Sequence, residues 1–282
     1  MAVQTKMSTS EAVAQLRLDP ENRDFIRDSY FDEDVLAAAE RFANSAEFAE
    51  VCSLLGGKVV DAAVLDLGAG TGIASYAFAR AGARSIHALE PDDSELGMKA
   101  IVRLMHFAPI TPLEGVGESI SLPDQSVDLV YGRQVLHHVK ELPKVMLECA
   151  RVLKPGGLFL ACREHVVDND DQLKQFLREH PVHQLAGGEH AYSLEAYTES
   201  IRASGLTLQK CLGPWDSLIN AFPSVRSKAE LDRFAETFLR ERFNRVGNLL
   251  RFVPGMTQLA WQRIRSYRAP GRLYSFLAKK QA

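Results

Sequence analysis

An apolar run that contains one acidic residue and passes directly into a glycine-rich turn is the feature that most constrains this 282-residue chain. It reads Val64-Leu65-Asp66-Leu67-Gly68-Ala69-Gly70-Thr71-Gly72, and a helical pattern follows from Ile73. Glycines at a strand-to-helix turn let the backbone come close to a bound ligand. The segment therefore predicts an α/β fold with a ligand site at the carboxyl edge of a sheet.

Short apolar runs alternate with helical patterns after residue 59, which is how a parallel sheet covered by helices on both faces appears in a sequence. Strands are expected at 63–67, 85–89, 127–131, 158–162, 206–212 and 272–278. Helices are expected at 73–81, 94–107, 142–153 and 194–204. This order predicts an α/β, Rossmann-like, doubly wound sheet that is mainly parallel, and the sheet is expected to be seven-stranded, with one strand more than these apolar runs mark.

Two segments lie outside this alternation. Residues 32–55 place apolar side chains at three- and four-residue spacings, which predicts one or two amphipathic helices, and a polar leader precedes them. We therefore expect an N-terminal leader and helical cap at 1–58, a ligand-binding domain at 59–282, and a helical insertion at about 221–270 before the last strand.

From residue 221 onward thirteen Lys or Arg stand against four Asp or Glu, a net charge of +9. Only this part is expected to attract anions.

Composition and residue spacing narrow the class of protein, its expected location in the cell and the kinds of site it can contain. Hydrophobic residues make up 46% and charged residues 24% of the chain, as in an ordinary soluble enzyme. Neither a signal peptide nor a run of about 20 apolar residues is visible, so a cytoplasmic location is expected. Because there is no CxxC and no H-E-x-x-H spacing, no metal site is predicted.

Two ligand classes compete for the glycine turn. The dinucleotide fingerprint is G-x-G-x-x-G, with a pyrophosphate at the helix N-terminus. Here the spacing is G-x-G-x-G and Asp66 precedes it. A carboxylate repels a pyrophosphate, whereas it suits a sulfonium or an α-amino group. The turn alone still leaves an NAD(P)-dependent oxidoreductase as an alternative.

The turn resembles motif I of class I S-adenosylmethionine (SAM)-dependent methyltransferases, and the resemblance covers roughly residues 59–161. Glu90 matches the acid that binds the ribose hydroxyls, and Glu118 falls where the family has an Asp near the adenine amino group. Residues 127–139 and 151–157 resemble the fourth strand with its loop and the turn before the fifth strand. The cofactor-binding residues implied by the resemblance are Asp66, Gly68, Ala69, Gly70, Gly72, Glu90, Pro91, Glu118, Ser119, Arg133 and Gln134.

The resemblance is closest to small-molecule enzymes of the quinone-biosynthesis type. It implies SAM as cofactor and methyl transfer to a small molecule, at oxygen rather than carbon or nitrogen, with an anionic acceptor left open. A non-catalytic SAM-binding or scaffold protein is the other alternative.

Histidines supply the candidate catalytic groups. His137 and His138 are candidates for a general base, with a structural role as the competing interpretation. Because adjacent helical residues point about 100° apart, at most one is expected to face the pocket. Arg133 is expected to pair with the methionine carboxylate of SAM or with an internal acid such as Asp66. Candidate substrate-binding residues after the fifth strand are Arg163, His165, His183, His190 and Tyr192.

The basic insertion has three interpretations: helices that pack on the sheet, a lid over the pocket, or a surface for peripheral contact with an anionic membrane. Nucleic acid is not expected as a partner. The Asn/Asp-Pro-Pro-aromatic signature of amino-group DNA methyltransferases is absent where Gly132-Arg133-Gln134 stands, and no RNA-binding module is visible.

Overall fold

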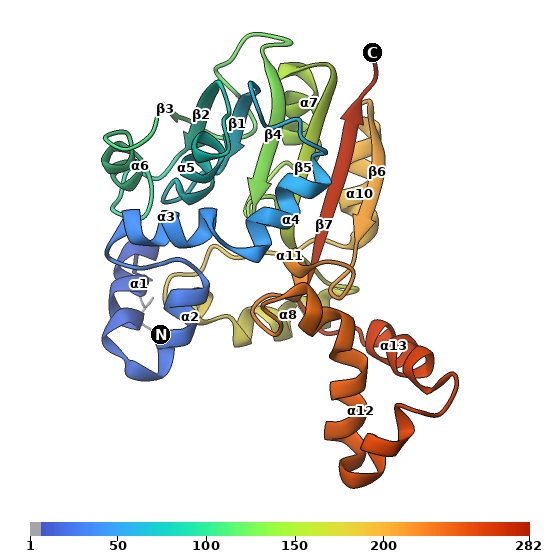
Figure 1. Ribbon diagram of the computed structural model, residues 1–282. Coiled ribbons are helices and arrows are strands. Elements are labelled where there is room, and N and C mark those ends of the chain that lie inside the picture. Colours follow the sequence, from blue (N-terminus) through green and yellow to red (C-terminus); the bar gives the residue numbers. More distant parts are fainter. Residues whose placement is uncertain (1–6) are drawn as a thin grey trace.

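The computed structural model describes residues 7–282, with side chains described for all of these except 244–248. One sheet of seven strands, in the order β3-β2-β1-β4-β5-β7-β6, forms the centre of this part of the chain (Figure 1). The strands are β1 (Ala63–Leu67), β2 (Ser85–Glu90), β3 (Ile110–Glu114), β4 (Val127–Arg133), β5 (Leu153–Val166), β6 (Leu206–Leu212) and β7 (Arg272–Lys280). Only β7 runs antiparallel to its neighbours, so the predicted mainly parallel sheet is confirmed.

Helices cover both faces of the sheet because its central strands are apolar on both sides. Neighbouring residues of β1 enter different cores: Val64 packs in the cluster with Phe42 and Phe78, and Leu65 packs in the cluster with Met146. This alternation follows from the two-residue repeat of a strand. The helices beside the first cluster are α3 (Val35–Ala43), α4 (Ala46–Leu54), α5 (Ile73–Arg80) and α6 (Met98–Leu104), and those beside the second are α7 (Leu142–Val152) and α10 (Leu194–Ala203).

The edge strand β3 is the element of the sheet that the apolar pattern did not predict. Its residues Ile110–Glu114 are mostly half-buried or exposed, and Pro112 stands at its centre. Proline lacks the N–H that a central strand needs and is tolerated at an edge. The strand therefore lacks the buried apolar run that marks the others.

The segment read as a polar leader folds into helices. They are α1 (Thr9–Leu18), the 3-10 helix η1 (Pro20–Asn22) and α2 (Arg23–Asp28). Ser8 and Glu11 form a capping box at the start of α1. Val13 and Leu16 then pack with Leu96 and Val182, so this part of the cap touches the short helix α9 (Pro181–Leu185), which follows β5 and α8 (Asp170–Glu179).

Helices fill the predicted insertion between β6 and β7. They are α11 (Leu218–Ala221), α12 (Lys228–Leu250) and α13 (Met256–Ser266), and α12 and α13 project from the body (Figure 1). Ala235 and Leu239 of α12 pack against Ala260 and Ile264 of α13. In the described part of the chain, no helix is both long and apolar enough to cross a bilayer.

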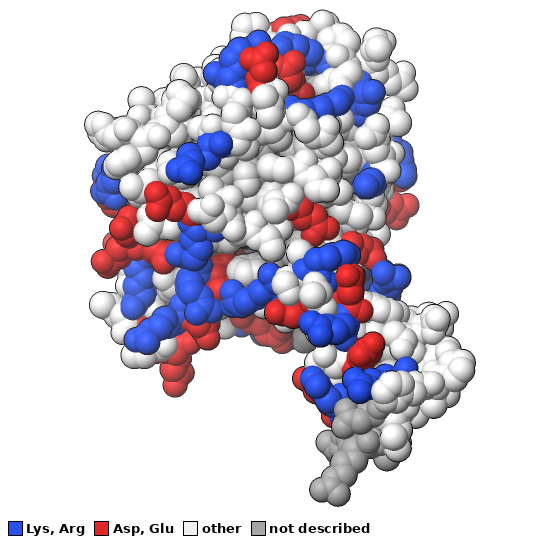
Figure 2. All heavy atoms as spheres, in the orientation of Figure 1, with Lys and Arg blue, Asp and Glu red and all other residues white. Residues whose placement is uncertain are grey.

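Lys and Arg gather where the cap and the base of α12 meet the sheet body, interleaved with Asp and Glu (Figure 2). Arg226 and Asp28 pair at 2.8 Å across this boundary, and Arg265 of α13 pairs with Asp216 at 3.3 Å. Part of the positive charge of the insertion is therefore neutralised within the chain.

Candidate active site

A cavity of about 490 Å³ opens at the carboxyl ends of β1, β2 and β4, a size typical of small-molecule sites. This edge of an open α/β sheet is where ligands bind. One wall is the glycine turn with Glu90, and a second wall carries histidines. The cap closes a third side with Thr9, Phe25, Ser29 and Phe31. The other lining residues are Asp66, Gly68, Ala69, Gly70, Thr71, Ile73, Ala74, Glu90, Pro91, Asp92, Arg133, Gln134, Val135, His137, His138, His165, His180, Val182 and Glu189.

The glycine turn presents bare backbone to the cavity. Gly70 has a φ of +52°, and a Cβ built on it would meet nothing within 4 Å. Its N–H donates to Oε2 of Glu90 at 2.7 Å, and the N–H of Ala69 donates to the carbonyl of Leu89 at 2.9 Å. The turn is thus tied to the end of β2 and leaves space that a ligand can enter.

Asp66 lies beneath this turn as a buried carboxyl group. Ser75 Oγ donates to its Oδ2 at 2.6 Å. Burial raises the pKa of Asp66 to about 7, against the smaller opposing effect of the Ser75 hydrogen bonds. A cationic ligand stabilises the ionised carboxylate, whereas a pyrophosphate repels it, so the site fits a sulfonium cofactor better than a dinucleotide.

Glu90 is held in place at the end of β2. Its two carboxylate oxygens accept hydrogen bonds from the N–H groups of Gly70 and Asp92, at 2.7 and 3.0 Å. Burial raises its pKa. Each oxygen retains a lone pair, so the carboxylate can still accept a hydrogen bond from ligand hydroxyls.

Two predicted cofactor-binding residues, Glu118 and Ser119, do not line the cavity. Glu118 is partly exposed, and its Oε1 accepts a hydrogen bond from the N–H of Lys140 at 3.2 Å. Ser119 is exposed. Their contact with a cofactor stays a prediction, whereas Pro91 does line the cavity.

Arg133 pairs with an acid that the sequence analysis did not consider. Its Nε donates to Glu47 of α4 at 2.7 Å, and the two side chains are 10% and 1% exposed. The guanidinium also lies over the ring of Tyr30, 5.3 Å from its centroid. The charge of Glu47 offsets the cost of burial and raises the pKa of Arg133. The internal acid is therefore Glu47 and not Asp66, and it joins the cap to the end of β4.

Both histidines after β4 line the cavity, so the expectation that only one would face it is wrong. Residues 136–138 form a turn, and α7 begins only at Leu142, so the helical angle does not apply. Glu164 of β5 holds this turn: its carboxylate accepts hydrogen bonds from the N–H groups of Val135 and His137 at 3.1 Å each. Nδ1 of His137 lies 2.8 Å from the same carboxylate.

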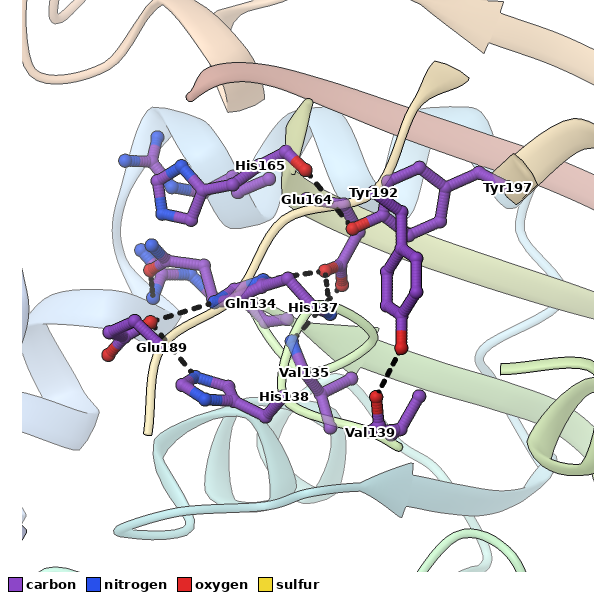
Figure 3. A network of polar contacts seen from close by, with 12 residues as sticks. Gln134, Val135, His137, His138, Val139, Glu164, His165, Glu189, Tyr192 and Tyr197 are labelled. Carbon is purple, nitrogen blue, oxygen red and sulfur yellow. Dashed lines mark hydrogen bonds and ion pairs between the residues drawn. The ribbon is translucent and has the colours of Figure 1, made fainter. Parts of the chain in front are cut away.

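Glu189 faces the other side of the histidine turn. Its Oε2 lies 3.5 Å from Nε2 of His137 and 3.7 Å from Nε2 of His138, and its Oε1 lies 3.8 Å from Nδ1 of His180 (Figure 3). Burial opposes the charge of His137, but the contacts with Glu164 and Glu189 outweigh it and raise its pKa to about 9. Desolvation and the charge of His137 lower the pKa of His138 to about 4. The imidazoles outweigh burial at Glu189 and lower its pKa to about 2.

Of the predicted substrate-binding residues, His165 lines the cavity and the others do not. Nδ1 of His165 donates to the carbonyl of Gly271 at 2.7 Å. Tyr192 lies behind the histidine turn and donates its hydroxyl to the carbonyl of Val139 at 2.6 Å. Arg163 is buried elsewhere, with Nη1 donating to the carbonyls of Ile219 and Phe222.

Neither His183 nor His190 lines the cavity. His183 lies on α9, where its N–H contacts Nδ1 of His180, and the ring of His190 packs against Tyr192. His180, Glu164 and Glu189 are the neighbours that the structure brings to the histidine turn instead. Glu164 lies near the end of β5, and His180 and Glu189 lie in the polar stretch that follows it, but no fixed spacing in the sequence singled them out.

Comparison with known proteins agrees with this geometry. Residues 65–161 match the family described as Methyltransferase domain. The chain is also similar to a solved S-adenosylmethionine dependent methyltransferase from Mesorhizobium loti, with a TM-score of 0.54, 18% identity, and coverage of 84% of this chain and 100% of that one. The chain carries a class I methyltransferase domain. S-adenosylmethionine is the cofactor that the name of the M. loti protein specifies.

Two curated relatives differ in the atom that their names specify. The methyltransferase domain aligns with a ubiquinone biosynthesis O-methyltransferase from Rhizobium etli, 28% identical over 51% of this chain and 60% of that protein. It also aligns with a dimethylglycine N-methyltransferase from Parasynechococcus marenigrum, 28% identical over 60% of each chain. The chain thus spans about 60% of the length of these relatives.

Proposed function

We propose that this chain transfers the methyl group of SAM to an oxygen atom of a small molecule. The observation that carries the proposal is one cavity with two unlike walls. Bare glycine backbone, Asp66 and Glu90 form a wall suited to a cationic nucleoside, and the second wall bears His137 and His138. An acceptor bound between the two walls would lie next to both the cofactor and the histidines.

In this proposal the cofactor wall is made of Asp66, the turn through Gly72, and Glu90 with Pro91. Asp66 supplies negative charge and Glu90 supplies hydrogen-bond acceptors. The cap closes the cavity with Phe25 and Phe31, which excludes water from the reaction. Residues 1–58 are thus proposed as a cover for the domain that follows.

Oxygen is favoured as the acceptor atom because the second wall is polar and rich in hydrogen-bonding groups. A hydroxyl acceptor must be oriented and must lose a proton, and imidazoles and carboxylates suit both tasks. The name of the R. etli relative supports oxygen, whereas that of the P. marenigrum relative makes a tertiary or secondary amine the second candidate.

The chemistry needs alignment more than a single catalytic group. Bound SAM supplies a methyl group on a sulfonium, so the acceptor forms a bond to the methyl carbon while the C–S bond breaks and its electron pair stays on sulfur. The protein contributes by holding the acceptor in line, which is worth up to about 7–11 kcal/mol in favourable intramolecular reactions. The chain's part is therefore to fix the acceptor against the His137 turn.

Calorimetric titration with SAM, S-adenosylhomocysteine and NADH tests the cofactor, and transfer of radiolabelled methyl groups into metabolites of a cell extract tests the reaction. We expect micromolar binding of the first two ligands, which Gly70→Val abolishes, and labelled products that partition as methyl ethers. Tight NADH binding without SAM binding would make the chain an oxidoreductase. Binding of SAM without label transfer would make it a SAM-binding scaffold.

A further inference from the structure

We propose that His137, His138 and Glu189 bind a divalent transition-metal ion in the acceptor half of the cavity. One ligand atom from each residue, an imidazole nitrogen of each histidine and a carboxylate oxygen, lies within 4.8 Å of the other two. The sequence analysis predicted no metal site because these residues follow no known ligand spacing. The fold assembles them from the turn after β4 and the loop after α9.

The separations suit coordination better than hydrogen bonding. Oε2 of Glu189 lies 3.5 Å from Nε2 of His137 and 3.7 Å from Nε2 of His138. A hydrogen bond between such atoms normally measures about 2.7–3.2 Å. Two ligands that each stand about 2.0–2.1 Å from one tetrahedral ion are separated by about 3.4 Å. Both separations from Glu189 are therefore close to those around a single ion, and the third separation lies within 4.8 Å.

A second observation points to the same ligand. Oε2 of Glu189 is buried, and it makes no hydrogen bond with any described residue. A buried carboxylate oxygen without a donor is costly unless another group satisfies it. The imidazoles of His137 and His138 form only long ion pairs with this oxygen, at 3.5 and 3.7 Å, and a metal ion between them would coordinate it directly.

The residue behind His137 completes the arrangement. Glu164 accepts the Nδ1 hydrogen bond of His137 at 2.8 Å, which aims Nε2 at Glu189 (Figure 3). A carboxylate that holds the far nitrogen of a histidine is the usual support of a metal-ligating imidazole. With Glu164 and Glu189, two carboxylates stand close to the site, and their charge favours a dication.

Two imidazoles and one carboxylate are a ligand set that zinc accepts while keeping open positions, and Mn²⁺, Fe²⁺ and Co²⁺ are of the same class. All three residues line the cavity, so an open position faces the space for the acceptor. A hydroxyl that binds such an ion loses its proton to solvent more easily. This role of the ion rests on the proposed function, but its binding does not.

The test is a calorimetric titration of the EDTA-treated, dialysed full chain with Zn²⁺, with Co²⁺ absorption as the spectroscopic check. We expect one ion per chain, bound at micromolar level or tighter, with visible Co²⁺ bands of four- or five-coordinate nitrogen and oxygen ligation. Glu189→Gln and His138→Asn should each weaken binding by about 100-fold, at or beyond the effect of losing a supporting group. His138 is 44% exposed, so its substitution does not threaten the fold.

His106→Asn is the matched control, because His106 is an exposed histidine that does not line the cavity. It should leave Zn²⁺ binding unchanged. Zn²⁺ binding that survives Glu189→Gln and His138→Asn, or no binding below millimolar concentration, would overturn the metal site. SAM titration and methyl-transfer assays of the same samples separate the two proposals. Metal binding without methyl transfer would contradict the proposed function alone. Methyl transfer by protein that binds no metal would contradict the metal site alone.

Discussion

The two walls of the cavity are built in different ways. The cofactor wall comes mainly from one continuous segment, Asp66 to Gly72, and it offers backbone groups and open space. The histidine wall consists of side chains, among them His137, His138, His165 and Glu189. They come from the turn after β4, the end of β5 and the loop after α9. A wall made of backbone needs glycines at set positions, so it leaves a pattern in the sequence. A wall made of side chains needs only the fold to bring them together.

The largest effect is expected from removing the carboxylate that holds the histidine wall. Glu164→Ala leaves the N–H groups of Val135 and His137 and one imidazole without their buried acceptor. Loss of such a buried charged partner costs about 3–5 kcal/mol. Denaturant unfolding should show this loss, whereas Glu199→Ala, at an exposed position of α10, should change stability by less than about 0.5 kcal/mol.

Alanine at two neighbouring glycines should separate folding from binding in the cofactor wall. A Cβ on Gly68 would stand 2.2 Å from Cγ2 of Val135, so Gly68→Ala should cost about 2–4 kcal/mol of stability through overpacking and positive φ. A Cβ on Gly70 would point into open space, so Gly70→Ala should cost only about 1 kcal/mol yet weaken SAM binding at least about tenfold.

Gly156→Ala is the control for this pair. Gly156 also has positive φ and open space, but it does not line the cavity. It should lose the same stability as Gly70→Ala while binding SAM as the wild type does. Equal SAM affinity in Gly70→Ala and Gly156→Ala would mean that the turn does not hold the cofactor.

The affinity for SAM should rise with pH because of Asp66. Its pKa of about 7 keeps the carboxyl group protonated at lower pH, and the sulfonium cation favours the ionised form. Binding should therefore tighten about tenfold between about pH 6 and pH 8 and level off above that range, with release of a proton. Calorimetry in buffers of different ionisation enthalpy counts the proton. Asp66→Asn, or the use of S-adenosylhomocysteine, which lacks the sulfonium charge, should flatten the profile.

The smallest effect is expected behind the histidine wall. Tyr192→Phe removes the 2.6 Å hydrogen bond to the carbonyl of Val139, which should cost about 1 kcal/mol of unfolding free energy. SAM affinity should not change, because Tyr192 does not line the cavity. A larger loss of methyl transfer than of stability would instead give Tyr192 a role in placing the acceptor.

The sheet and the cofactor wall were predictable because their causes are local. Buried runs such as Ala63–Leu67 mark the inner strands, and the glycine spacing marks the turn. The edge strand Ile110–Glu114 was missed because it lacks such a run, and the helix Thr9–Leu18 was read as leader because its apolar face is narrow.

The histidine wall was predictable only as a set of residue types. Nothing near Glu47 shows that it will pair with Arg133, since the two meet only when α4 packs over the end of β4. Likewise, Glu189 reaches His137 through tertiary packing, and His138 faces the cavity because the chain turns where a helix was expected. Side-chain partnerships of this kind depend on the finished fold.

The contact between Gly68 and Val135 makes the two walls energetically dependent on each other. Val135 occupies the space over Gly68, and its N–H is held by Glu164, so a displacement on one side presses on the other. Coupling between two binding sites is reciprocal. The factor by which an acceptor-side ligand changes the affinity for SAM equals the factor by which SAM changes the affinity for that ligand. We therefore expect Val135 to couple the binding of SAM to the binding of an acceptor-side ligand.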